Sequence, residues 1–164
     1  MKITIITPCF NVESTILDCI QSVDKQRVTV KHLIIDGVST DRTLSIIADY
    51  ISKNKCNIEL ISEADNGVYD AMNKGILRSN SEIVGLLNAD DFYVDENVLT
   101  KVVDLFKDEN VMATYAELNY VAFGDTSKIV RKWNAGTYKS ERFYYAWMPP
   151  HQTFFVRRIL SANY

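Results

Sequence analysis

Two hydrophobic periodicities alternate along the first 110 residues, and this alternation restricts the chain to few folds. Four short apolar or β-branched runs are too short for typical helices and predict buried strands at residues 3–7, 32–36, 58–62 and 82–87. Apolar residues at helical spacing predict amphipathic helices around residues 16–23, 44–51, 68–76 and 99–106. We therefore expect an α/β fold with a mostly parallel central sheet and helices on both faces.

The alternation stops near residue 111. Three later runs, "VMATYAEL", "KIVRKW" and "TFFVRR", predict further strands in a mixed arrangement. Between the last two of these runs, residues 137–151 contain Pro149, Pro150 and many large aromatic side chains, which favours a loop over a pocket. We expect about residues 1–110 to bind a ligand and about residues 111–164 to begin a second, acceptor-side part of one domain that spans residues 1–164.

Composition and charge narrow the class of protein. The three cysteines are odd in number and lack CxxC spacing, which favours a reducing compartment. The segment "MKITIITP" does not resemble a signal peptide, so we expect a soluble cytoplasmic protein. Residues 1–125 carry a net charge of −9 and residues 126–164 one of +6. The basic segment suits phosphate, an anionic membrane surface or the acidic remainder of the chain, and we expect no nucleic-acid partner.

Polar side chains follow each predicted strand. Asp36 follows the second strand, Asp65 the third, and Asn88, Asp90 and Asp91 the fourth. In a parallel sheet these positions share one edge, where ligands bind. Adjacent carboxylates there predict a site for Mg²⁺ or Mn²⁺ and a metal-bound diphosphate. Two alternatives remain open: Asp91 caps the helix that begins near Asp95, or the acids form a solvated turn.

Asp36 also has two readings. In "DGVSTDRT", Gly37 permits a tight turn and Ser39, Thr40 or Asp41 can cap the following helix, which is a purely structural role. Alternatively, the Asp36 carboxylate accepts a hydrogen bond from a nucleobase or a ribose hydroxyl. The first strand is followed by neither GxGxxG nor GxxxxGK[ST], and the chain lacks GxSxG, so dinucleotide, P-loop and hydrolase-elbow sites are excluded.

Four motifs in this order, "TPCFN", "DGVSTDRT", "SEADNGVYDAMNKGI" and "GLLNADDF", resemble the nucleotide-sugar half of family 2 inverting glycosyltransferases, which have the GT-A fold. The later "PPHQTFFVRR" resembles a segment of bacterial members that build surface polysaccharides. The match covers residues 3 to about 158. The resemblance implies that Thr7 and Pro8 line the nucleotide pocket, that Asp36 contacts the base, and that Asp65 and the helix bearing Asn73 close the nucleotide side.

The resemblance also implies a metal site. "NADD" stands at the family's DxD motif, so Asp90 is the expected metal ligand, and Asn88 replaces the usual first aspartate. An amide can bond a ribose hydroxyl, but it carries less negative charge and predicts weaker metal binding. Asp91 is expected to act through a water or the donor sugar. His151 is expected to supply a metal ligand or a donor to the diphosphate, with a purely structural loop histidine as the alternative, whereas His32 is expected to be structural.

The implied reaction moves a sugar from a nucleoside diphosphate to an acceptor hydroxyl, saccharide or lipid-linked, with inversion. Its general base lies, in relatives, in an acidic motif downstream of "HQTFF", and we expect it beyond Tyr164. Two other functions remain open. A sugar-phosphate nucleotidyltransferase also binds metal-bound phosphates, but "TPCFNVEST" lacks the glycine-rich basic loop of such enzymes. A non-catalytic nucleotide-sugar-binding module would bind the donor without transfer.

Overall fold

The computed structural model describes residues 1–145 and 147–161, without the side chains of Arg142 and Phe143. Its first 105 residues form four strand–helix pairs: β1 Ile3–Cys9, α1 Ile16–Asp24, β2 Val30–Asp36, α2 Thr43–Lys53, β3 Ile58–Ser62, α3 Val68–Arg78, β4 Ile83–Leu86 and α4 Val98–Leu105. The predicted strands and helices are all present in this region. Prediction from periodicity works here because β1, β2 and β4 are mainly buried and each helix buries one face, while β3 is partly buried at the edge of the sheet.

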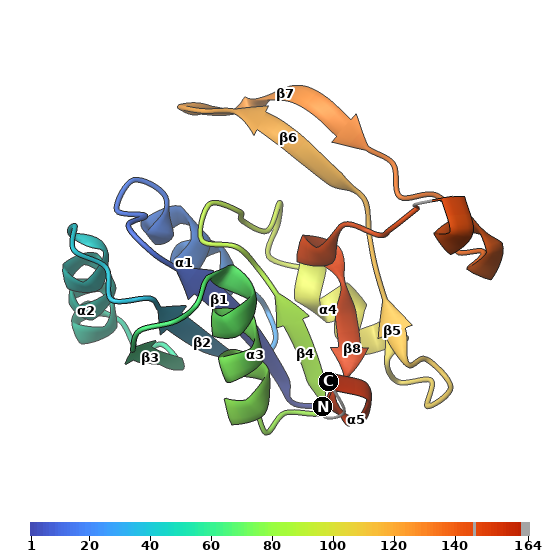
Figure 1. The fold of residues 1–164 in the computed structure, drawn as a ribbon, viewed down its shortest axis with the longest axis horizontal. Helices are drawn as coiled ribbons and strands as arrows, with labels where there is room; N and C mark the ends of the chain where they lie inside the picture. Colours follow the sequence, from blue (N-terminus) through green and yellow to red (C-terminus); the bar gives the residue numbers. More distant parts are fainter. Residues whose placement is uncertain (146, 162–164) are drawn as a thin grey trace.

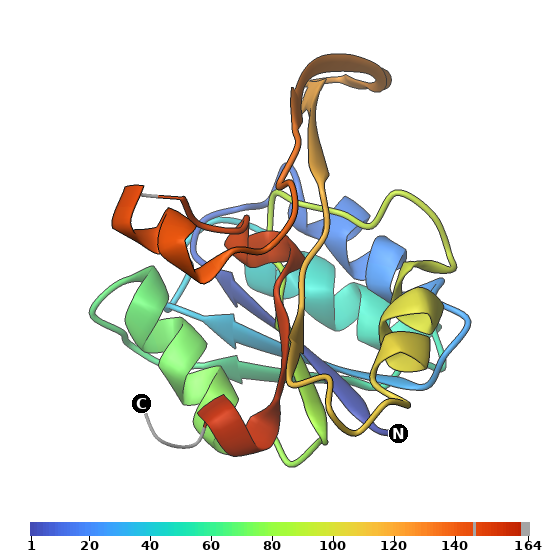
Figure 2. The same cartoon turned by 90° about the vertical axis from the view of Figure 1, so that its right-hand side faces the viewer.

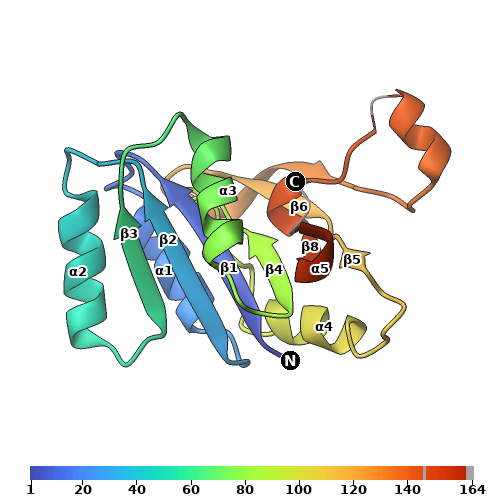
Figure 3. The ribbon, with the colours of Figure 1, turned by 60° about the horizontal axis from the view of Figure 1, so that its bottom comes forward.

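These elements build a mixed sheet with the strand order β3-β2-β1-β4-β8-β5. The first four strands in this order are parallel to one another, and β8, Phe155–Arg157, runs antiparallel to both of its neighbours. Helix α3 lies on one face, while α1, α2 and α4 cover the other, as Figures 1 and 3 show. The predicted α/β fold with a mostly parallel sheet is therefore confirmed.

Each face of the sheet has its own apolar layer. Ile3 and Ile5 of β1 pack with Leu99 and Phe106 of the α4 region, whereas Ile6 points to the opposite face. A further cluster joins α1, α2 and the sheet, and it includes the buried residue Ala89 just beyond β4. These layers hold the carboxyl-terminal ends of β1, β2 and β4 in fixed relation, because buried side chains at native packing density leave little room for strands to shift.

The three runs predicted as strands in the last third of the chain all contain strands, but not all of these join the sheet. Residues 111–117 form only the two-residue strand β5, Ala113–Thr114, before the chain leaves the sheet. Strands β6, Leu118–Ala122, and β7, Asp125–Trp133, then pair as a separate ribbon that projects from the sheet (Figure 2). Most side chains of this ribbon are exposed, so its strands follow from local pairing and not from an apolar pattern.

The segment before β8 is irregular, as expected, with two short 3₁₀ helices, η1 Ser140–Tyr145 and η2 His151–Thr153. β8 then enters the sheet beside β4. A Cβ atom on Gly85 would lie 2.5 Å from the ring of Phe155, so only glycine at this position lets the two strands pack. No helix among the described residues is both long and apolar enough to cross a membrane.

Candidate functional site

The predicted site residues gather along the carboxyl-terminal edge of the parallel strands. Cys9, Asp36 and Ser62, the last residues of β1, β2 and β3, are paired side by side in the sheet. The amide of Leu87, just after β4, donates to the carbonyl of Ile6 in β1. The segments that carry Asp36 and Asp90 therefore leave the sheet at one edge, separated only by β1.

Asp36 is fully buried and its two carboxylate oxygens already have partners. The Ser39 amide, at 3.0 Å, and the Ser62 hydroxyl, at 2.7 Å, donate to Oδ2. The Ser39 hydroxyl and, at 3.7 Å, the Cys9 thiol donate to Oδ1. These bonds match the structural reading of Asp36, because they close the turn after β2. The predicted contact with a nucleobase would have to be added to this set.

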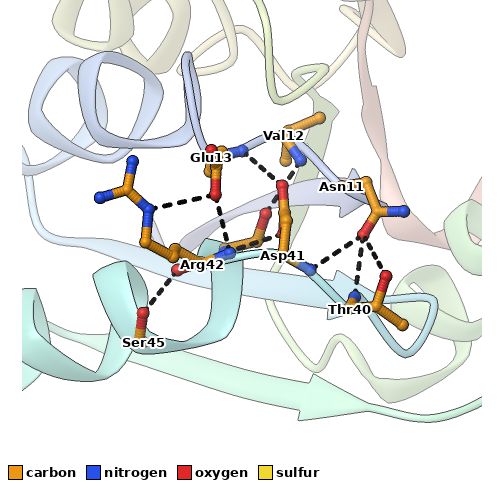
Figure 4. Close-up of polar contacts among 8 residues, drawn as sticks. Asn11, Val12, Glu13, Thr40, Asp41, Arg42 and Ser45 are labelled. Carbon is orange, nitrogen blue, oxygen red and sulfur yellow. Dashed lines mark hydrogen bonds and ion pairs between the residues drawn. The ribbon is translucent and has the colours of Figure 1, made fainter.

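The loops after β1 and β2 are joined by hydrogen bonds, as Figure 4 shows. Asn11 has a left-handed backbone with a φ of 52°, and its Oδ1 accepts hydrogen bonds from the amides of Thr40 and Asp41. In return, the Asp41 carboxylate accepts from the amide of Glu13, and the Glu13 carboxylate binds the backbone and side chain of Arg42. Because these bonds run in both directions, the two loops form one unit that fixes the turn around Asp36.

Asp65 and Asn73, the other two residues predicted to border the nucleotide, differ in their contacts with these loops. The Asp65 carboxylate lies against Gly37, where a Cβ atom would come within 2.7 Å of Oδ2, and its Oδ1 accepts from the Gly67 amide at 2.8 Å. Asn73 is exposed in the middle of α3. Between Asp36 and Ser39, the β-branched Val38 has a φ of 66°, a strained conformation of the kind that clusters at functional sites.

Thr7 and Pro8 are buried within β1. The Thr7 hydroxyl lies 2.9 Å from Nε2 of His32 and 3.9 Å from the Cys19 thiol, beneath the edge of the sheet. Thr7 is thus packed under the predicted nucleotide pocket and does not point into it. Burial lowers the pKa of His32 to about 3, so this histidine is neutral and has the structural place expected of it.

Beyond β4, residues Asn88 to Asp91 form a tight turn, which we call the acid turn. The Asp91 amide donates to the Asn88 carbonyl at 3.0 Å, and Ala89 anchors the turn in the core. Asp90 is exposed, whereas Asp91 is half-buried, and Oδ2 of Asp91 has no hydrogen-bond partner among the described residues. Burial, and then the neighbouring charge of Asp90, raise the pKa of Asp91 to about 6.

The capping alternative for Asp91 is wrong. Helix α4 begins at Val98, seven residues later, and its N-cap Asn97 makes no side-chain capping bond. The Asp95 carboxylate instead accepts from the Asn97 amide at 2.7 Å. The acid turn therefore contributes nothing to the start of this helix.

His151 lies on η2, and its Nε2 is 3.4 Å from Nδ2 of Asn88. Two predicted site residues, 63 positions apart in the sequence, are thus brought together. Within the described residues, no group of three or more His, Cys, Asp or Glu side chains is arranged to hold a metal ion. A metal at Asp90 and His151 would need further ligands from substrate phosphates and water, which is the usual manner of Mg²⁺.

Sequence reasoning missed the polar residues that hold the chain after the acid turn. Cys19, Ser22 and Gln26 project from α1 and its end to atoms of residues 88–99. Their spacing of three and four residues places them on one face of a helix. Polar residues on the same stripe as Ile16, Ile20 and Val23 were the available signal.

Comparisons with known proteins identify the family of this chain. Residues 4–159 match the family described as glycosyl transferase family 2. A PGL/p-HBAD biosynthesis glycosyltransferase of Mycobacterium bovis is 28% identical over 164 residues, which cover 98% of this chain and 60% of the relative. Chondroitin synthase of Escherichia coli is 25% identical over 95% of this chain and 23% of the relative. The chain thus spans less than two thirds of the length of these relatives.

Solved structures share the fold. S. aureus TarS 1-349 in complex with UDP-GlcNAc superposes with a TM-score of 0.74 and 20% identity, covering 99% of this chain and 47% of TarS. The mannosyltransferase PcManGT from Pyrobaculum calidifontis, in complex with GDP-Man and Mn²⁺, has the same TM-score with 18% identity, covering 98% of this chain and 45% of the mannosyltransferase. Together with the family match over residues 4–159, this likeness confirms the GT-A fold. The chain belongs to glycosyl transferase family 2.

Proposed function

We propose that this chain binds a nucleoside diphosphate sugar for transfer of the sugar to an acceptor hydroxyl with inversion, in the synthesis of a polysaccharide or glycolipid. The observation that carries the proposal is the acid turn, where two adjacent carboxylates follow Asn88, whose side-chain amide lies 3.4 Å from Nε2 of His151. Support also comes from relatives named as glycosyltransferases and from structural neighbours that hold UDP-GlcNAc or GDP-Man.

The residues of the acid turn fit a divalent cation. Two carboxylates held side by side repel each other, and the unpartnered Oδ2 of Asp91 is a buried acceptor without a donor among the described residues. We assign Asp90 and His151 as ligands of Mn²⁺ or Mg²⁺; a structural neighbour was solved in complex with GDP-Man and Mn²⁺. When bound, the metal would neutralise charge on the departing diphosphate. Asn88 would then bond a ribose hydroxyl, and Asp91 would act through a water or the donor sugar.

The nucleoside would lie across the ends of β1 and β2. Asp65 and the helix that carries Asn73 would border it on one side, and Pro8 would support it from below. Asp36 holds the turn from Gly37 to Ser39 in place, so in this proposal its main contribution is to fix that wall, with a direct bond to the base as an added contact. A preformed wall lowers the ordering cost of binding.

The acceptor would approach from the side of residues 111–161. Tyr144 and Tyr145 are strongly exposed there and offer flat surfaces for a sugar ring or a lipid-linked acceptor. The basic charge of this part suits a phosphate-bearing acceptor or the inner face of a membrane. The sequence also predicts Phe143 for this acceptor side, and its side chain lies outside the described residues.

Calorimetric titration of the chain with UDP and with GDP, each with and without Mn²⁺, tests the proposal. Heat that depends on Mn²⁺ is expected with one nucleotide, and no heat with either would overturn the assignment of the site. Release of free nucleotide from UDP-, GDP- and dTDP-sugars, with and without an acceptor, then separates transfer from binding alone. Pyrophosphate release from a nucleoside triphosphate and a sugar phosphate would instead indicate a nucleotidyltransferase.

A further inference from the structure

Helix α1 holds the whole segment from the acid turn to the start of α4. The Cys19 thiol donates to the Asn88 carbonyl at 3.6 Å, and the Tyr93 amide donates to the Ser22 hydroxyl at 3.1 Å. Farther along, Gln26 bonds the segment twice: its Nε2 donates to the Asp95 carbonyl at 2.7 Å, and its Oε1 accepts from the Leu99 amide at 2.9 Å. Four bonds from three side chains thus run along residues 88–99.

The donors and acceptors of this arrangement are fully assigned. Burial raises the pKa of the Cys19 thiol to about 12, so the S–H group remains a donor. The Ser22 hydroxyl donates to the Cys19 carbonyl within the helix at 2.8 Å, which leaves its lone pairs to accept from Tyr93. Because Nε2 of Gln26 also donates to the Ser22 carbonyl at 3.1 Å, the side-chain amide is held from both sides. Each group is therefore oriented before any ligand binds.

The bond from Cys19 reaches the acid turn itself. The Asn88 carbonyl that accepts from this thiol is also the carbonyl that closes the turn through the Asp91 amide. Cys19 in turn lies beside the Thr7 hydroxyl, which contacts the neutral ring of His32. A buried polar chain therefore leads from β2 through β1 and α1 to the turn, and no charged group is needed to maintain it.

The hydrogen bonds from Cys19, Ser22 and Gln26 oppose the charge repulsion in residues 88–99. Asp90 and Asp91 repel each other, and the exposed Asp90 gains little from burial. Releasing the segment would take the Ser22 and Gln26 acceptors away from the Tyr93 and Leu99 amides, and a buried amide without an acceptor is unfavourable. The bonds from α1 therefore favour the closed segment in spite of the charge repulsion at the turn.

We propose that Cys19, Ser22 and Gln26 are positioning residues, which hold residues 88–99 against α1 and so place the carboxylates of Asp90 and Asp91 for the metal-bound diphosphate. This inference rests on the proposed function. Cys19 acts on the acid turn, Ser22 on the chain just after it, and Gln26 on its connection to α4. Residues that orient metal ligands from behind typically contribute 10- to 100-fold to metal affinity.

The variants Cys19→Ala and Ser22→Ala test the proposal, with Cys19→Ser as the conservative change because a hydroxyl keeps a donor. Leu33→Val is the matched control, since Leu33 is buried on the opposite face of the sheet, in the layer under α3. In titrations of UDP and GDP at increasing Mn²⁺, we expect Cys19→Ala to raise the Mn²⁺ concentration for half-maximal binding about 10-fold. Cys19→Ser should restore most of the loss, and Leu33→Val should leave the value unchanged.

Amide hydrogen exchange measures, without a ligand, how firmly residues 88–99 are held against α1. Cys19→Ala should speed exchange of the Asp91 amide, and Ser22→Ala that of the Tyr93 amide, each about 10-fold more than Leu33→Val does. Equal exchange and equal Mn²⁺ dependence in Cys19→Ala and Leu33→Val would overturn the positioning role. If the unmodified chain binds neither Mn²⁺ nor nucleotide, the proposed function fails, and the exchange rates alone decide the role of α1.

Discussion

The carboxylates at the ends of β2 and β4 differ in burial and in hydrogen bonding. At the end of β2, Asp36 is fully buried, and four donors satisfy its carboxylate. At the end of β4, Asp90 is exposed and Asp91 retains a buried oxygen without a partner among the described residues. The carboxylate of Asp36 uses its acceptor oxygens to close a turn within the protein. The carboxylates of Asp90 and Asp91 still have oxygens without donors among the described residues, and these could bind a ligand.

The largest expected effect would come from Asp36→Asn, which tests the structural side of this contrast. The amide keeps one acceptor oxygen and places an NH₂ group against the donors of Ser39 or Ser62, so the free energy of unfolding should fall by about 3 kcal/mol. Urea denaturation measures this change. Asp90→Asn is the comparison and should change stability by less than about 0.5 kcal/mol, because Asp90 is exposed. Similar losses in both variants would abolish the distinction.

The second effect concerns ligand binding, where we expect the change at Asp90 to matter although it barely affects stability. Asp90→Asn should weaken Mn²⁺-dependent nucleotide binding about 100-fold, because it removes the charge of the assigned metal ligand. Calorimetry with UDP and GDP at fixed Mn²⁺ measures the loss. Asp104→Asn makes the same charge change at an exposed position of α4 and should bind like the unmodified chain. Unchanged binding in Asp90→Asn would remove Asp90 from the site.

A third, smaller effect is a pH dependence confined to the acid turn. The pKa of Asp91 is raised from 3.8 to about 6, so the folded chain holds this proton more tightly than the unfolded chain. The stabilisation is complete below pH 3.8 and is lost as the pH rises through about 6. The difference in unfolding free energy between the unmodified chain and Asp91→Asn should therefore change over this interval. A difference that is constant from pH 4 to pH 7 would contradict this assignment.

The smallest expected effect comes from making the acid turn more acidic. Asn88→Asp restores the commoner first acid of the motif and should strengthen Mn²⁺ binding by about 3- to 10-fold, since cation affinity rises with the number of charged ligands. It should also lower stability slightly in the absence of metal, because a third carboxylate joins the repelling pair. Calorimetry measures the expected increase in Mn²⁺ affinity, and the midpoint of urea denaturation without metal measures the expected decrease in stability. An unchanged Mn²⁺ affinity would show that residue 88 does not face the cation.

The sequence predicted the two halves of the chain unequally, for physical reasons. The apolar run at 32–36 was found because these residues of β2 are buried in the interior of the sheet. The run at 58–62 was placed to the residue although β3 is only partly buried at the edge of the sheet. The β6–β7 ribbon has exposed side chains and no such pattern, so its separation from the sheet could not be foreseen. At the site, topology predicted which segments share an edge. The inward turn of Thr7 and the hydrogen bonds of Asp36 depend on side-chain packing, which the pattern does not encode.

The entry of β8 between β4 and β5 determines when the site can form during synthesis. His151 stands on η2, immediately before a strand that pairs with residues 83–85, about 70 positions earlier in the chain. While a ribosome still covers residues 151–157, the nascent sheet presents the acid turn without the imidazole that meets Asn88. Such a long sequence separation also slows closure of the sheet. The nascent protein is thereby expected to complete its parallel strands first and to bring His151 to Asn88 last.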